Sequence, residues 1–168
     1  MSDVKDLAQA GNKNIASLEQ KFEATHCLLL PVNKEILLLP NAAVAEIVPY
    51  QEPEAADNAP DWFVGYLSWR DHRLPVISIE AASDGEVGKI HKNCRIAVLN
   101  TLNGNSELPY IAIIMQGLPS LQIVRPDSLQ KDDSEQRQSI SANVTVNGAE
   151  ALIPNLDDLE TRIQQLHT

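Results

Sequence analysis

Short apolar runs separated by turn-forming residues recur along this chain, and most have the length of β-strands. The first two cover residues 26–32 and 35–40, with Asn33-Lys34 between them as a hairpin turn. Leucine favours helices, but Pro31 and Pro40 exclude one long helix through both runs. Further strand-like runs lie at residues 44–48, 65–70, 72–79, 95–100, 110–115, 121–124, 143–146 and 149–153.

Turn chemistry supports this strand assignment in the second half of the chain. Asn147-Gly148 lies between the last two runs and is the strongest short-range hairpin signal in the sequence. Residues 110–115 are almost entirely apolar, as expected of a strand that is buried on both faces. Residues 130–139 carry no apolar side chain, which predicts a loop.

The two ends of the chain differ from this strand-rich middle. Residues 1–22 form a polar tail, in which Ala8, Ile15, Leu18 and Phe22 show only weak helical spacing. The other end predicts a helix after residue 155, with an asparagine N-cap and acidic residues in the first turn. Its apolar positions on one face are Leu156, Leu159, Ile163 and Leu166.

These elements predict an all-β sandwich or barrel with one C-terminal helix. The pattern predicts a folded domain over residues 23–168, preceded by the polar tail. Residues 81–92 form a polar linker near the middle of the chain. We therefore expect two subdomains, with their boundary near residues 80–92. In the segment 61–64, one helical turn ended by Gly65 is also expected.

Composition narrows the class of partner. Hydrophobic residues make up 43% of the 168 residues, which is enough for a real core. The formal charge of -10 disfavours nucleic acid and an anionic membrane surface, because both require a basic surface. No apolar run approaches the ~18 residues of a spanning helix. The N-terminus has no secretory signal, and Cys27 and Cys94 fit buried, reduced thiols, so a cytoplasmic location is expected.

The candidate metal ligands and catalytic groups do not form a convincing site. His91 and Cys94 could place two metal ligands together, joined in principle by His26-Cys27, but the paired clusters of a structural zinc site are missing. Ser68, Asp71 and His72 have the side chains of a catalytic triad, yet neighbours on a hairpin diverge. We expect no metal, no cofactor and no catalysis.

Residues 41–79 hold five of the seven aromatic side chains and a charged turn at residues 70–73. Strand alternation places Val44, Glu46 and Val48 on one face, an apolar surface with a charged centre that suits a protein contact. Burial of both faces, with Glu46 paired to an arginine, is the alternative. The aromatic residues Trp62, Phe63 and Trp69 are expected in the core, and Tyr66 on the surface.

The same stretch resembles the core signature of CheW-like coupling domains. The matching elements are Val44-x-Glu46-Ile47, the segment APDWFVG at residues 59–65, Arg70, and LPV at residues 74–76. In that family the signature reads V-x-E-I, a Pro-containing short helical turn ending in Gly, an RG turn and an L-P-V strand. The resemblance runs from about residue 25 to the C-terminal helix and is strongest before residue 80.

This resemblance implies two small five-stranded β-barrels that share an apolar core. It also implies a non-catalytic adaptor that links the cytoplasmic tip of a chemoreceptor to the regulatory domain of a histidine kinase, as part of a two-component system. Glu46, Arg70 and Val44 match family positions at the receptor-facing surface. Glu46 and Arg70 are both expected to point outward, so a pair between their two strands is predicted. The residues expected to bind a partner are Val44, Glu46, Val48, Tyr66, Arg70 and Asp71.

The chain also departs from the family pattern. Asp71 replaces the glycine after the arginine, and Gln116 replaces the acid that ends the family's G-[ILV]-[ILV]-V-D run. Residues 117–120 lack the usual V-x-x-V alternation. Such divergence resembles auxiliary members from chemosensory systems linked to type IV pili and twitching motility. The alternatives from other classes are a β-barrel enzyme that uses Asp71 and His72, and a ligand-binding module lined by Trp62 and Trp69.

Overall fold

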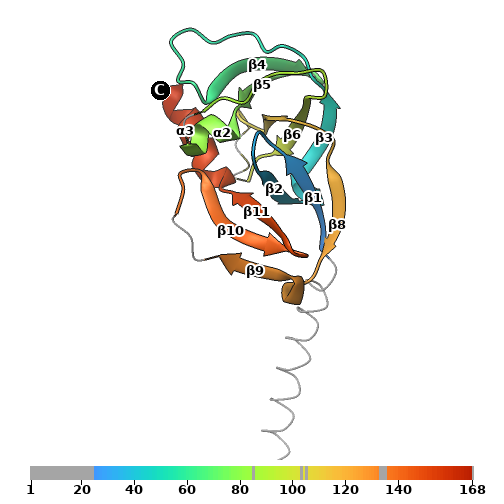
Figure 1. Cartoon of the computed structure of the whole chain (residues 1–168). Coiled ribbons are helices and arrows are strands. Elements are labelled where there is room, and N and C mark those ends of the chain that lie inside the picture. Colours follow the sequence, from blue (N-terminus) through green and yellow to red (C-terminus); the bar gives the residue numbers. More distant parts are fainter. Residues whose placement is uncertain (1–24, 85, 103, 105, 133–135, 168) are drawn as a thin grey trace, which may run out of the picture.

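The computed structural model describes residues 25–84, 86–102, 104, 106–132 and 136–167. The predicted polar tail lies outside these residues. The described part contains two mixed β-sheets, two short 3-10 helices and two α-helices (Figure 1). No helix in these ranges is both long enough and apolar enough to cross a lipid bilayer.

The first sheet contains the first and the last strand of the described chain. Its six strands follow in the order β8 (Ser120–Val124), β1 (Thr25–Pro31), β2 (Ile36–Pro40), β11 (Ala149–Pro154), β10 (Ile140–Val146) and β9 (Leu129–Asp132). Strand β11 runs parallel to β2, whereas the other neighbours are antiparallel. The parallel pair joins the first hairpin of the fold to the last one.

The second sheet comes from the middle of the chain. Its five strands follow in the order β3 (Val44–Pro49), β6 (Arg95–Asn100), β7 (Tyr110–Met115), β5 (His72–Ile77) and β4 (Phe63–Trp69). Strands β5 and β7 are parallel, and the remaining pairs are antiparallel. The 3-10 helices η1 (Asn41–Ala43) and η2 (Pro126–Ser128) follow β2 and β8.

The strand-rich class with a C-terminal helix is confirmed, but two details of the prediction are wrong. The first sheet has six strands because residues 130–132, part of the predicted loop 130–139, pair with β10 together with Leu129 as a charged edge strand. The predicted boundary near residues 80–92 does not separate the sheets, since β5 and β6 belong to the same one. The chain changes sheets between β2 and β3 and again between β7 and β8.

Three apolar clusters account for the packing. The largest lies between the sheets and combines strands of both with the C-terminal helix, for example Leu37, Ile113 and Ile163. A second cluster consists of residues from strands of the six-stranded sheet, and a third of residues from strands of the five-stranded sheet. The shared core implied by the family resemblance is therefore present. Residues 110–115 are buried as predicted, with Ile111, Ile113 and Met115 at 0% exposure.

The helices α2 (Ile79–Asp84) and α3 (Leu156–Leu166) cover one side of the central cluster. The first covers the end of the predicted strand 72–79 and the start of the predicted linker 81–92, and it buries Ile79 and Ala82. The second begins where predicted, because the Asn155 side chain accepts a hydrogen bond from the Asp158 N–H at 3.0 Å. Its predicted apolar face is buried except for Leu166, which stays 41% exposed at the last turn.

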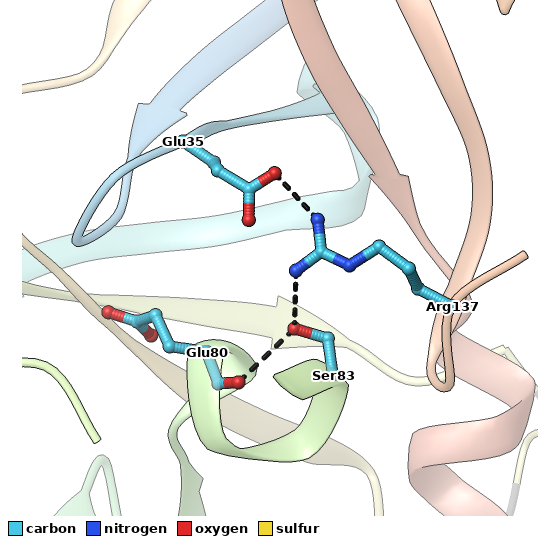
Figure 2. Close-up of polar contacts among 4 residues, drawn as sticks. All are labelled: Glu35, Glu80, Ser83 and Arg137. Carbon is cyan, nitrogen blue, oxygen red and sulfur yellow. Dashed lines mark hydrogen bonds and ion pairs between the residues drawn. The ribbon is translucent and has the colours of Figure 1, made fainter. Parts of the chain in front are cut away.

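A polar network ties the first sheet to α2. The Arg137 guanidinium, just before β10, contacts a Glu35 carboxylate oxygen at 2.6 Å and donates to the Ser83 hydroxyl at 3.1 Å (Figure 2). Ser83 in turn donates to the Glu80 carbonyl at 3.2 Å. These contacts join residues 102 positions apart in sequence, and they fix the loop before β10 against α2.

Candidate functional site

The charged turn is the tip of the β4–β5 hairpin. Trp69 pairs with His72, so the connection consists of two residues, Arg70 and Asp71. Both have positive φ angles, 42° and 64°, as a type I′ turn requires. Aspartate tolerates this left-handed region better than most side chains, so Asp71 can replace the glycine of the family pattern without changing the turn.

Glu46 of β3 is the centre of the contacts around this tip. Its Oε2 lies 3.2 Å from Arg70 Nη2 and accepts a hydrogen bond from Trp69 Nε1 at 2.7 Å. The Arg70 guanidinium also lies 5.0 Å from the Trp69 ring centroid. The predicted pairing of Glu46 with Arg70 is confirmed. The indole contact was missed, although a partly buried Trp N–H usually finds an acceptor.

This group links the two edges of the five-stranded sheet. Strands β3 and β4 lie at opposite ends of the strand order, so a contact between them brings the edges together. A second link comes from Glu54, whose backbone exchanges two 2.8 Å hydrogen bonds with that of Tyr66 in β4. We call Glu46, Trp69 and Arg70 the edge clasp. It holds a charged side chain at a fixed place over a curled sheet.

Gly65 permits the second link. Its φ is +154°, and a Cβ atom there would lie 2.2 Å from the Glu54 carbonyl oxygen. The expected helical turn before Gly65 is therefore wrong, since β4 already begins at Phe63 with a bulge at this glycine. Glycine is required here because the backbones of residues 54 and 65 lie close together, and not because a helix ends at this position.

A β-bulge separates the valines that alternation placed together. The register shifts between Val44 and Glu46, so Val44 packs against the central cluster together with Ile47. Val48 packs against the cluster of the five-stranded sheet. The predicted common face of Val44, Glu46 and Val48 is wrong, because strict alternation does not survive an extra residue.

Tyr66 has contacts other than those of the edge clasp. Its hydroxyl lies 2.8 Å from His167 Nε2, beyond the end of α3, and the Arg73 guanidinium lies 3.9 Å from its ring centroid. The ring packs against the central cluster and is half-buried. Tyr66 thus anchors the C-terminal residues, whereas Trp69, three positions on, faces the cluster of the five-stranded sheet.

Comparisons with known proteins identify the family. The family model for the CheW-like domain matches residues 26–164, most of the chain. The chain belongs to this family. Among solved structures it is similar to the scaffolding protein TtCheW from Thermoanaerobacter tengcongensis, with a TM-score of 0.67 and 14% identity over 79% of this chain and 85% of that one. A search of curated proteins found no match.

The alternative chemistries receive no support from this CheW-like domain. His72 faces the rings of Tyr110 and Trp69 at 5.2 and 6.4 Å, and in the described residues no hydrogen bond joins it to Ser68 or Asp71. The described ranges contain no group of three or more potential metal ligands. Trp62 and Trp69, expected in the core, are half-buried against different apolar clusters, whereas Phe63 is buried as expected.

The cysteines of the domain are buried free thiols. Cys27 lies in the first sheet, and Cys94 just before β6. Burial raises the pKa of the Cys27 thiol above its usual value. The same cause, followed by the charge of Glu52, raises the pKa of Tyr50.

The CheW-like fold also exposes an apolar strip that the sequence pattern did not reveal. Leu121 and Ile123 of β8 are 60% and 51% exposed, and Leu118 before the strand is 71% exposed. Strand β8 ends the order of the six-stranded sheet, and Leu121 lies opposite Leu28 of β1. Alternating exposed leucine and isoleucine on an edge strand are typical of a protein contact.

Proposed function

We propose that this protein is a non-catalytic cytoplasmic adaptor that couples the tip of a chemoreceptor to the regulatory domain of a histidine kinase. The observation that carries the proposal is the edge clasp, which holds the Arg70 guanidinium and the Glu46 carboxylate in one place on a CheW-like fold. A rigid pair of opposite charges beside half-buried aromatic and aliphatic side chains specifies orientation in a protein complex. The similar solved structure is described as a scaffolding protein, which agrees with this role.

The clasp suits recognition better than stability. Its Arg70 side chain is 68% exposed, so its ion pair with Glu46 adds little to folding. The guanidinium nevertheless has two defined contacts, at 3.2 Å from the Glu46 carboxylate and 5.0 Å from the Trp69 ring centroid. It retains N–H donors for a carboxylate or backbone carbonyl of a receptor helix.

Co-elution tests the proposal directly. The full chain is mixed with a receptor cytoplasmic fragment and, separately, with a kinase regulatory domain, and each mixture is passed over a size-exclusion column. We expect a complex in both cases, at micromolar concentrations typical of signalling contacts. If the protein binds neither partner, the adaptor role is contradicted. The variant Arg70→Glu should lose receptor binding while its circular dichroism spectrum stays unchanged.

The apolar strip on β8 is a second surface that an adaptor for two partners could use. The variant Leu121→Ser removes exposed apolar area without touching the buried clusters. We expect it to weaken one of the two complexes, and the same pair of columns identifies which one. Thr145→Ser, a substitution on β10 in the same sheet, is the matched control and should leave both complexes unchanged.

We further propose that the protein serves a pilus-linked chemosensory system that controls twitching motility. The departures at Asp71 and Gln116 support this placement. Gln116 contacts His91 Nε2 at 2.8 Å through its amide oxygen, where the family's acid would bring a negative charge. Co-elution with kinase regulatory domains from a pilus-linked and a flagellar system tests it. Preference for the flagellar partner contradicts this narrower assignment.

A further inference from the structure

An apolar groove opens at the end of the six-stranded sheet where β1 begins. Its volume is about 360 Å³, and its walls come from β1, β2, β8, β9 and β11. Cys27, Leu38, Val124, Leu129 and Ile153 line it, and the cationic member of the lining is Arg125. The same apolar side chains belong to or pack against the cluster inside this sheet. The groove therefore gives access to the apolar cluster of the six-stranded sheet.

The strand order explains why the core is accessible at this point. The six-stranded sheet ends at β8 on one side and at β9 on the other, and η2 connects these two strands at the groove. Val124 is the last residue of β8 and Leu129 the first of β9, so the lining includes residues from both edges of the sheet. A groove in this place accepts apolar side chains without displacing any strand.

The segment that precedes β1 has the composition and the position to fill the groove. Twenty-four residues come before Thr25, which itself lines the groove. Ile15, Leu18 and Phe22 in this segment are spaced at i, i+3 and i+7, the interval that places side chains on one face of a helix. Phe22 is three residues from Thr25, so its backbone lies within about 10 Å of the lining.

Charge also agrees with this occupant. Glu19 and Glu23 are next to Leu18 and Phe22 in the sequence, and Arg125 lies in the groove lining. Each apolar anchor is followed directly by an acidic side chain that can meet the Arg125 cation, and Lys21 is the basic residue between the two anchors. A second copy of the chain is a poorer occupant, because two molecules with a formal charge of -10 repel each other.

We propose that residues 15–22 dock into this groove, with Phe22 and Leu18 seated against Leu38, Val124 and Ile153. Docking is intramolecular, so the covalent link to Thr25 provides a high effective concentration even for a small contact. The segment then covers the core of the six-stranded sheet at its open end. Any partner that uses this end of the sheet has to displace it.

Methyl NMR spectra of the full-length chain test this proposal. The variant Phe22→Ser removes the main anchor, and Gln20→Ser is the matched control on a neighbouring polar position. We expect Phe22→Ser to shift the methyl resonances of Leu38, Val124 and Ile153, whereas Gln20→Ser leaves them in place. The wild-type shifts should not depend on protein concentration.

Thiol reactivity gives a second readout. Cys27 lines the groove and Cys94 is fully buried away from it, so Cys94 serves as the internal reference in peptide mass spectrometry. We expect Phe22→Ser to raise the alkylation rate of Cys27 roughly tenfold, as for a segment docked about nine-tenths of the time. Unchanged groove methyls and an unchanged Cys27 rate overturn the proposal. Groove shifts that grow with protein concentration overturn it too, since they assign the groove to a second copy.

Discussion

Removal of the Glu46 carboxylate should lower the stability of the fold mainly by breaking its hydrogen bond to Trp69, and less by breaking its ion pair with Arg70. The carboxylate contacts both side chains, at 2.7 Å from the indole nitrogen and 3.2 Å from the guanidinium. The two contacts differ in solvent exposure. The Arg70 side chain is 68% exposed and that of Glu46 36%, whereas the bond to Trp69 is partly buried. Geometry and burial therefore favour the indole.

The magnitudes follow from this difference. An exposed ion pair contributes about 0–1 kcal/mol, so we expect a coupling free energy below about 0.5 kcal/mol between Glu46 and Arg70. A hydrogen bond to a charged group contributes about 1.5–3 kcal/mol, and partial exposure places the Trp69 bond near the lower end. For a domain of this size, Glu46→Ala should then lower the melting temperature by about 3–6 °C.

Two double-mutant cycles separate the contributions. Glu46→Ala is combined once with Trp69→Phe and once with Arg70→Ala, and free energies of unfolding are measured by urea titration with circular dichroism. We expect a coupling of about 1–1.5 kcal/mol in the first cycle and close to zero in the second. High salt should reduce only the second coupling. A larger coupling to Arg70 than to Trp69 would refute this reasoning.

Three further predictions concern stability. Gly65→Ala should destabilise by at least about 1–3 kcal/mol in thermal unfolding, because its Cβ would meet the Glu54 carbonyl and its φ is unfavourable. Asn155→Ala should cost about 1 kcal/mol by the same assay, through loss of the cap on Asp158 N–H, whereas Asn155→Ser should retain most of it. Burial raises the Cys27 pKa, so its stabilising effect is complete below the unfolded thiol pKa of about 8.5 and declines above it; Cys27→Ala should flatten this alkaline decline in urea titrations.

The sequence specified local structure well where turn and cap chemistry is explicit. Asn147 and Gly148 have positive φ angles of 49° and 83°, and they form the hairpin turn that their side chains favour. Asn155 caps the C-terminal helix in the same local way. These signals depend on neighbours within a few residues, so no knowledge of the tertiary fold was needed.

Structure that depends on distant partners could not be read in this way. Residues 130–132 are polar, and they form a strand together with Leu129 because β10 offers them a free edge. The helix α2 forms where the end of a strand and the start of a polar linker were predicted, because Ile79 and Ala82 pack into the central cluster. The bulge after Val44 depends on the register with β6. In each case tertiary packing outweighs local propensity.

At the candidate site too, one contact could be predicted from the sequence, whereas contacts that depend on the tertiary fold could not. The pairing of Glu46 with Arg70 was predicted because a family signature relates the two positions. The role of Trp69 follows from the closure of β3 against β4, which no spacing along the chain reveals. The exposed strip on β8 was missed because an apolar run in a sequence suggests a buried strand. Only the strand order shows that β8 lies at the edge of its sheet.

Titration calorimetry with a receptor cytoplasmic fragment tests the central claim most directly. The wild-type chain is compared with Arg70→Glu and with Lys131→Glu, which makes the same charge change on the exposed edge strand β9. The adaptor mechanism predicts that Arg70→Glu weakens binding about tenfold or more, while Lys131→Glu stays within about twofold of wild type. Equal affinities for all three proteins, or equal losses in both variants, would contradict a receptor contact at the edge clasp.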